Sequence, residues 1–266
     1  MAADLFVDSD GLRLAVRDHG GNGVPIVLVH GHLGNLAEYD DLGPRLARHM
    51  RVVAYDQRGQ GWSESGPVGV ESFAADLAAV VRALELERPV LLGSSFGALV
   101  CLAYALAGGS SRAFINQDGR ASDFEATTAS QPPPPGRTVV RYEHWSTYLD
   151  GFSSFGTVGE LTARRASIRL GDGSYEVRPS QEQAFQKERA FGRLPVLDGY
   201  RAIRCPVLIL NATRGGRPIG EREAELRRLG EHVDATARWY DTGHWISAED
   251  VAGVAEAVTE FASQLE

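Results

Sequence analysis

Cysteine is scarce in this chain of 266 residues, which has only Cys101 and Cys205, each within an apolar run. Two such thiols predict buried, reduced side chains rather than a disulfide framework, and a reducing, cytoplasmic compartment. Long hydrophobic runs are missing too, since none approaches the roughly 20 residues that cross a bilayer. The acidic N-terminus lacks the basic start and apolar stretch of a signal peptide. We therefore expect no membrane partner.

Positive charge is also in deficit, with 27 Lys and Arg against 35 Asp and Glu and a net charge of −8. This sign disfavours binding to phosphate backbones, so nucleic acid is not an expected partner. No G-x-G-x-x-G follows a strand-like run and no P-loop is present, so no nucleotide cofactor is expected. With 43% hydrophobic and 23% charged residues, the composition is typical of a folded globular protein and specifies no oligomeric state.

Short apolar runs alternate with longer amphipathic stretches, which predicts an α/β fold: a mostly parallel sheet of eight strands with helices on both faces. The expected strands are Leu5 to Val7, Leu12 to Asp18, Pro25 to His30, Arg51 to Tyr55, Pro89 to Gly93, Ala113 to Gln117, Cys205 to Asn211 and Thr236 to Tyr240. The turn from Asp8 to Gly11 favours an antiparallel hairpin of the first two. Apolar spacing from Val251 to Leu265 predicts a C-terminal helix with Ser247 as its N-cap.

The alternation stops between about Gly119 and Ala202. This stretch holds Pro132 to Pro135, an aromatic cluster and a polar, helix-like segment from Gln181 to Arg189. We predict a core formed by residues 1–120 and 203–266 and a helical cap, or lid, inserted at residues 121–202. The prolines are expected to form a rigid surface connector, although such a run also suits proline-reading domains.

The segment from Val90 to Leu99 is an apolar run that ends in G-x-S-x-G and continues into an apolar helix. A nucleophile on a sharp strand-to-helix turn needs small neighbours, which Gly93 and Gly97 supply. Ser95 occupies the central position, where its hydroxyl would lie at a helix N-terminus. An ordinary glycine-rich turn would show the same pattern, so a second signal is needed.

That signal comes from two further segments. The apolar run Pro25 to His30 continues with Gly31 and His32, which gives H-G-H, and residues 56–63 form the turn D-Q-R-G-Q-G-W-S. Together with G-S-S-F-G, these motifs resemble those of the α/β-hydrolase superfamily, over nearly the whole chain outside the insertion. The resemblance implies an oxyanion hole formed by the backbone N–H groups of His32 and Phe96. His30 and His32 could also suggest a metal pair, but no third ligand of suitable spacing accompanies them, so we expect no metal.

The resemblance also implies a base and an acid for Ser95. His244 lies in the loop between the last strand and the C-terminal helix and matches the family's G-H position. The turn from Asn211 to Gly216, where most relatives have the acid, contains no carboxylate. Asp118 follows the preceding strand, as the acid does in haloalkane dehalogenases and zearalenone-type lactonases, and it is the predicted acid. A solvated turn aspartate is the alternative interpretation of Asp118.

These residues imply a serine hydrolase that cleaves a carboxylic ester or lactone of a small aromatic or apolar molecule through an acyl-enzyme, without a cofactor. Trp145 and Tyr148 of the insertion and Trp245 beside His244 are the candidate substrate-binding residues. The aromatics of the insertion would equally suit the core of the lid itself. Two alternatives stay open: a cofactor-free dioxygenase of N-heteroaromatic rings or another non-hydrolytic enzyme of this fold, and a ligand-binding relative without catalysis.

Overall fold

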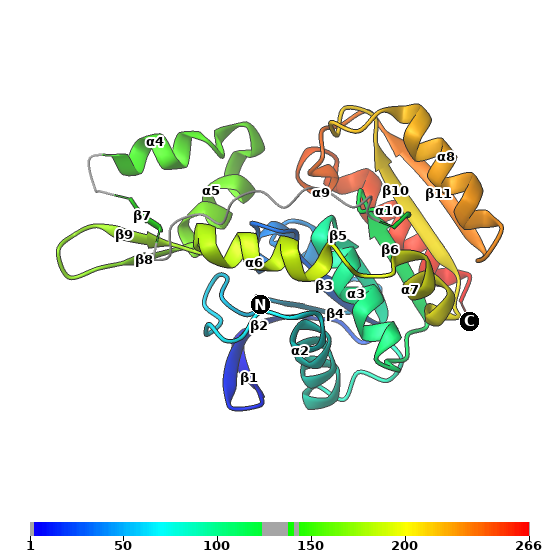
Figure 1. Cartoon of the computed structure of the whole chain (residues 1–266), viewed down its shortest axis with the longest axis horizontal. Coiled ribbons are helices and arrows are strands. Elements are labelled where there is room, and N and C mark those ends of the chain that lie inside the picture. The colour runs from blue at the N-terminus through cyan, green and yellow to red at the C-terminus, as the bar shows by residue number, and fades with distance from the viewer. Residues whose placement is uncertain (1–2, 124–137, 141–143, 266) are drawn as a thin grey trace.

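The computed structural model describes residues 3–123, 138–140 and 144–265. Its centre is a sheet in the order β1-β2-β4-β3-β5-β6-β10-β11, in which β1–β2 and β2–β4 pair antiparallel and the others parallel (Figure 1). The strands are β1 (Ala3–Ser9), β2 (Leu12–Gly20), β3 (Pro25–Val29), β4 (Arg51–Tyr55), β5 (Val90–Ser94), β6 (Ala113–Gln117), β10 (Val207–Ala212) and β11 (Ala235–Tyr240). Each predicted strand is found to within two residues at either end, so the predicted fold is confirmed.

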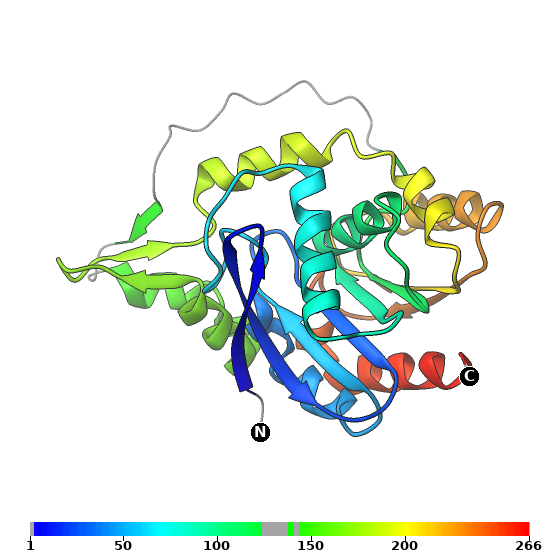
Figure 2. The same ribbon diagram turned by 90° about the horizontal axis from the view of Figure 1, so that it is seen from below.

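Alternate residues of the parallel strands face two different helix layers, as the two-residue period of a strand requires. Val27 and Val29 of β3 share an apolar core with α2 (Val70–Ala83), α3 (Phe96–Leu106) and α7 (Val196–Ile203). Ile26 and Leu28 face the other core, with α1 (Leu42–Leu46) and α10 (Val251–Ser263). Figure 2 shows the sheet between these two layers. Because parallel strands end at one edge of the sheet, the polar groups that follow them gather there.

The C-terminal helix α10 forms as predicted, but Ser247 is not its N-cap. Asp250 caps the helix, because its carboxylate accepts a hydrogen bond from the Gly253 N–H at 2.9 Å. Ser247 lies in a separate short helix, α9 (Ile246–Glu249), and is buried. Its hydroxyl lies 3.2 Å from the Gln117 side-chain amide, which donates to it. Ser247 therefore lies four residues before the first residue of α10, too far along the chain to cap it.

Between β6 and β10 the chain leaves the main sheet. The elements here are β7 (Thr138–Val140), α4 (Trp145–Asp150), η3 (Ser153–Phe155), α5 (Gly156–Arg165), β8 (Ser167–Arg169), β9 (Tyr175–Val177), α6 (Gln181–Phe191) and α7. The helix predicted over Gln181 to Arg189 is α6, which begins at a capping box of Ser180 and Gln183. The antiparallel sheet β7-β9-β8 was not predicted. Figure 1 shows α4, α5 and β7 to β9 beside the main sheet, α6 running from them toward α3, and α7 next to α3.

Buried polar side chains attach α5 to the core. Asn35 Nδ2 donates to the Thr162 carbonyl at 2.8 Å, and Arg165 Nε donates to Asp56 Oδ2 at 2.9 Å. Asp56 begins the D-Q-R-G-Q-G-W-S turn, so this motif helps to hold the segment that follows β6. The boundaries of the predicted insertion, residues 121–202, stay a prediction, and prolines 132–135 lie outside the described residues.

Both cysteines are free thiols. Cys101 is buried in α3 as predicted, whereas Cys205 is only partly buried because it precedes β10 instead of lying within it. Burial raises the pKa of both thiols, so neither has the thiolate character of a reactive cysteine. Across the described ranges, no helix combines the length and the apolar character that crossing a membrane requires.

Candidate active site

Ser95 lies at the turn between β5 and α3, with φ 51° and ψ −112°. Residues with a β-carbon rarely adopt this backbone, and such strain is typical of a nucleophile at a strand-to-helix turn. At Gly93 and Gly97 the surrounding backbone leaves no room for a β-carbon. A β-carbon on Gly93 would lie 2.4 Å from the Ala98 nitrogen, and one on Gly97 would lie 2.0 Å from the Val29 carbonyl oxygen. The close packing of strand and helix therefore fixes where the Ser95 side chain emerges.

Asp118 directly follows β6, and the structure brings it to His244. Its Oδ2 accepts a hydrogen bond from His244 Nδ1 at 2.5 Å. The Asp118 side chain is fully buried, whereas that of His244 is 52% exposed. With Nδ1 bound to the carboxylate, Nε2 is the nitrogen available for proton transfer. No hydrogen bond joins Ser95 to His244 within the described residues, although both line the same cavities, and such bonds are often long without substrate.

Arg222, on α8 (Ile219–Gly230), is a partner of Asp118 that the sequence patterns did not reveal. Its guanidinium is bonded to Asp118 Oδ1, which also accepts the Ala212 N–H at 3.0 Å. The Arg222 side chain is 2% exposed, so the ion pair is fully buried. Charge-assisted bonds of this kind orient a carboxylate strongly. Arg222 Nη2 also donates to Asp118 Oδ2, at 3.4 Å, so the guanidinium holds both oxygens while Oδ2 accepts from His244.

His32 and Phe96, the predicted oxyanion residues, lie side by side near Ser95. Phe96 is the first residue of α3, where a backbone N–H has no partner within the helix. His32 belongs to the loop that follows β3, and its ring centroid is 5.4 Å from that of Phe96. Burial lowers the pKa of His32 to about 4, so its imidazole is neutral at pH 7. Both residues line a cavity that also contains Ser95 and His244.

Two cavities meet at Ser95. The first, which we name the apolar chamber, has a volume of about 420 Å³, and its large apolar lining residues are Leu33, Phe152, Phe155 and Trp245. The second chamber has a volume of about 410 Å³, and its charged lining residues besides the site itself are Arg120, Glu188 and Arg217. His32, Ser95 and His244 line both chambers. A bound molecule therefore has room on either side of the serine.

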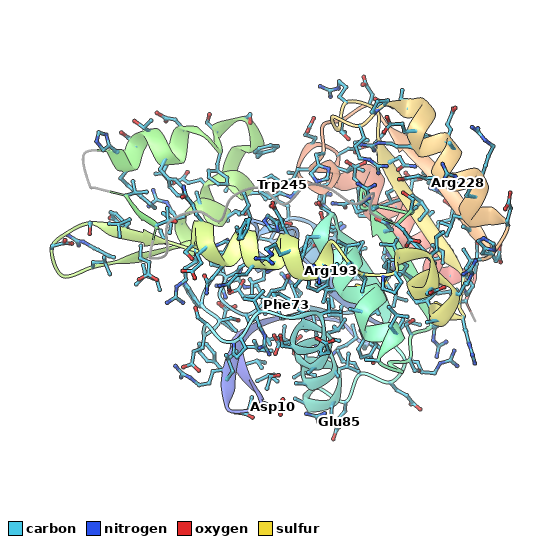
Figure 3. All side chains as sticks on the ribbon, viewed as in Figure 1. Asp10, Phe73, Glu85, Arg193, Arg228 and Trp245 are labelled. Carbon is cyan, nitrogen blue, oxygen red and sulfur yellow. The ribbon has the colours of Figure 1, made fainter. Side chains whose placement is uncertain are left out.

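Trp245, one of the predicted substrate-binding residues, lies in the apolar chamber, with its ring centroid 4.6 Å from that of Phe155. Figure 3 shows Trp245 where the core faces α5. Trp145 instead stacks on Tyr175 at 4.1 Å and on Tyr148 at 5.2 Å. Neither Trp145 nor Tyr148 is among the described residues that line the two chambers. Their substrate-binding role stays a prediction.

Glu38, on the short helix η1 (Leu36–Tyr39), is a polar group of the apolar chamber that the motifs did not indicate. The residue is 6% exposed. Its carboxyl packs on Gly34, where a β-carbon would lie 1.5 Å from Oε1. Burial raises the pKa of Glu38 to about 8, against the lowering effects of a hydrogen bond from the Gly31 backbone and of the Lys187 charge. Burial thus favours the protonated form of Glu38, whose carboxyl contacts the loop that contains His32.

His30 has the environment of a structural histidine. Its Nε2 accepts the Gln57 N–H at 3.0 Å, and its Nδ1 lies 2.9 Å from the Gly31 carbonyl oxygen. Burial lowers its pKa to about 3, so the ring is neutral. In the part of the chain that the structure describes, no group of three or more His, Cys, Asp or Glu residues is arranged to hold a metal ion.

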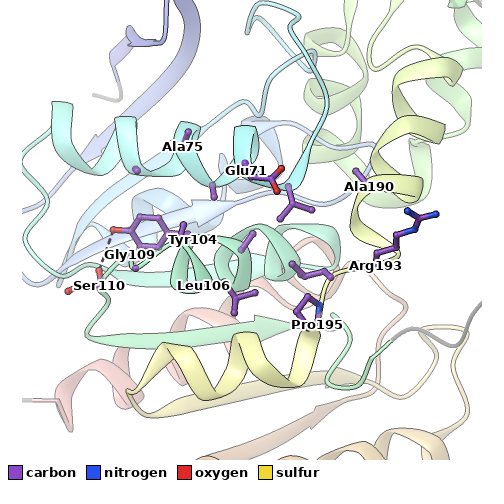
Figure 4. Close-up of a pocket in the computed structure, with 16 residues that line it drawn as sticks. Glu71, Ala75, Tyr104, Leu106, Gly109, Ser110, Ala190, Arg193 and Pro195 are labelled. Carbon is purple, nitrogen blue, oxygen red and sulfur yellow. Dashed lines mark hydrogen bonds between the residues drawn. The ribbon is translucent and has the colours of Figure 1, made fainter.

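A larger cavity, of about 830 Å³, lies away from Ser95, between α2, α3 and the segment after α6 (Figure 4). Alanine and glycine residues form much of its wall, together with Tyr104, Leu106 and Arg193. None of the predicted site residues lines it. The chemistry-bearing groups therefore point to the smaller chambers at Ser95.

Comparison with known proteins agrees with the fold. The profile of the alpha/beta hydrolase family matches residues 26–257. The 2-hydroxy-6-oxo-2,4-heptadienoate hydrolase of Pseudomonas putida is 31% identical, over 96% of this chain and 95% of that protein. The N-formylmaleamate deformylase of Pseudomonas putida is 27% identical, over 96% of this chain and 94% of that protein. The crystal structure of E-2-(acetamidomethylene)succinate hydrolase has a TM-score of 0.79 at 22% identity and covers 99% of this chain and 100% of that chain. The chain belongs to the alpha/beta hydrolase family.

Proposed function

We propose that this protein is a serine hydrolase that cleaves a carboxylic ester or lactone of a small molecule with an aromatic or apolar group. The main support is the 2.5 Å hydrogen bond between Asp118 and His244, beside cavities that both contain Ser95. A serine hydroxyl is a weak nucleophile without an adjacent base. An imidazole held by a buried carboxylate is such a base, and the carboxylate stabilises its charged form.

In this mechanism, Ser95 Oγ attacks the carbonyl carbon while its proton passes to His244 Nε2. The carbonyl oxygen gains the electron pair and becomes an oxyanion, which the N–H groups of His32 and Phe96 stabilise. The C–O bond then breaks, and the leaving alcohol oxygen keeps the bonding pair and takes the proton from His244. Water attacks the acyl-enzyme by the same route, which releases the acid and restores Ser95.

The chambers support a small substrate. Volumes of about 420 and 410 Å³ lie in the range of small-molecule sites. Phe155 and Trp245 present rings on one side of Ser95, which suits a flat or apolar group. The relatives are named for hydrolysis or deformylation of small molecules, which supports the same substrate size.

The test is a panel of esters, lactones, thioesters and N-formyl amides, run on the natural protein and on Ser95→Ala together. We expect turnover of at least one ester or lactone, and a loss of about 10⁴-fold or more in the variant, because the nucleophile is removed. Ser263→Ala, an exposed serine of α10, is the matched control. Turnover that survives Ser95→Ala, or oxygen uptake with an N-heteroaromatic substrate, would refute the proposal.

A further inference from the structure

Lys187 of α6 is a buried amine that contacts the loop containing His32. The residue is 1% exposed. Its Nζ donates to the His32 carbonyl oxygen at 2.7 Å and also bonds Gln60 Oε1. Gln60 Nε2 in turn donates to the same His32 carbonyl at 2.9 Å and to the Gly34 carbonyl at 2.8 Å. The His32 carbonyl therefore accepts two hydrogen bonds, one from α6 and one from the D-Q-R-G-Q-G-W-S turn.

The same helix also contacts Phe96. Lys187 Nζ lies 4.3 Å from the centroid of the Phe96 ring, a cation–π distance. Phe191, at the end of α6, packs on Phe96 with ring centroids 4.5 Å apart. The Phe96 ring contacts the His32 ring in turn. Both segments whose N–H groups form the proposed oxyanion hole are thus contacted by α6.

Space filling alone does not account for an amine at this position. Burial lowers the pKa of Lys187 well below its usual value, although the Glu38 charge opposes the shift, so the buried amine has a large desolvation cost. An apolar side chain of similar length would fill the same space without that cost. Unlike an apolar side chain, the Lys187 amine also donates to the His32 carbonyl and thereby restrains the loop.

We propose that Lys187 is a positioning residue that holds the His32 loop and Phe96 with their N–H groups directed at the substrate carbonyl. The oxyanion hole is then complete only when α6 is docked on the core. This proposal rests on the proposed function, because it assumes a tetrahedral intermediate at Ser95. It goes further, because it assigns part of the catalytic geometry to a residue outside the motifs.

The test compares Lys187→Met with Arg189→Met, an exposed cation on the same helix, using the best ester of the panel. Misplaced oxyanion donors weaken binding of the transition state more than binding of the substrate, so kcat should fall about 10²-fold in Lys187→Met with KM held within about threefold. Affinity for a boronic acid that forms a tetrahedral adduct on Ser95 should fall in parallel. Arg189→Met should have the same kcat, KM and boronic acid affinity as the natural protein.

Natural kcat and boronic acid affinity in Lys187→Met would overturn the proposal, as would a rise in KM alone. If Lys187→Met does not fold, Gln60→Met removes the second donor to the same carbonyl from the core side, and it must show the same loss of kcat with KM held. Ser95→Ala separates the two proposals. Turnover in that variant refutes the serine mechanism, whereas an inactive Ser95→Ala beside a fully active Lys187→Met refutes only the role of Lys187.

Discussion

The two sides of Ser95 are assembled from different parts of the chain. The proposed acid–base side consists of Asp118, His244 and Arg222, which follow or pack on the strands of the main sheet. The proposed oxyanion side combines the His32 loop of the core with Lys187 of α6. The first side depends on the sheet, and the second depends on a helix from the segment between β6 and β10. Substitutions in that segment should therefore affect oxyanion stabilisation more than they affect the proton relay.

The two sides also differ in their electrostatics. On the acid–base side, the buried carboxylate of Asp118 is compensated by the buried guanidinium of Arg222. On the oxyanion side, burial raises the pKa of Glu38 and lowers that of Lys187, so each group is shifted toward its neutral form. We therefore expect pH to affect the oxyanion side through Glu38 and Lys187, which are not part of the proposed proton relay.

The largest effect is expected for Asp118→Asn. An amide cannot hold the imidazole in the required tautomer, and in the serine protease template this change lowers kcat about 10⁴-fold. We expect a loss of similar order in ester turnover. Asp241→Asn is the control, because Asp241 is nearer to His244 along the chain but is 89% exposed and bonded to Arg214. Activity of Asp118→Asn within a few fold of the control would assign the acid elsewhere.

A large loss of stability is expected for Arg222→Met. Removing one partner of a buried ion pair leaves the Asp118 carboxylate uncompensated, which typically costs about 3–5 kcal/mol. Urea unfolding should show this decrease in the free energy of unfolding. Arg227→Met, an exposed arginine on the same helix, should change it by no more than about 0.5 kcal/mol. Equal stability of the two variants would show that the ion pair does not hold the acid in place.

Glu38→Gln is expected to change how stability depends on pH. Burial raises the Glu38 pKa from 4.5 to about 8, so its stabilising contribution is complete at low pH and is lost as pH rises through this window. Between these pH values, the free energy of unfolding of the natural protein should fall by up to about 1.4 kcal/mol per pH unit relative to that of the variant. Urea unfolding at several pH values measures the difference. Glu256→Gln, an exposed control on α10, should follow the natural protein, and a parallel curve for Glu38→Gln would contradict the assignment.

The smallest effect concerns the apolar chamber. Phe155→Ala should lower kcat/KM for an aromatic ester about tenfold, because the ring lines the chamber with Trp245. Tyr148→Ala should leave it within about twofold, since Tyr148 packs on Trp145 and on the lining residue Phe152 but does not itself line the chamber. Steady-state kinetics with matched aromatic and short aliphatic esters measures both. A larger loss in Tyr148→Ala would restore the substrate role predicted for that residue.

Much of the core could be predicted because its signals are local. Parallel strands buried on both faces give short apolar runs, and Gly93 is required by its contact with Ala98, only five residues further along the chain. Asp118 and His244, which are 126 residues apart along the chain, were predicted from the resemblance to the α/β-hydrolase superfamily and from their places after strands, because parallel strands end at one edge. The order of the strands in the sheet brings these two residues together in space.

Other features could not be predicted because no local pattern marks them. Arg222 and Lys187 lie on helices with many exposed charged residues, and only the packing of those helices on the core buries these two side chains. The strands β7, β8 and β9 have three residues each, too few to show a two-residue period. Ser247 and Asp250 are both good N-cap residues, and the separate short helix α9, which contains Ser247, moves the start of α10 to the residue after Asp250.

The central claim is that an acyl group is transferred to Ser95, and mass spectrometry tests it most directly. The natural protein would be mixed with a fluorophosphonate, and separately acid-quenched during turnover of the best ester, before digestion and peptide mapping. The account predicts a phosphonyl adduct and an acyl adduct on Ser95, and neither adduct in Ser95→Ala. An adduct on another residue, or ester turnover by Ser95→Ala, would contradict it.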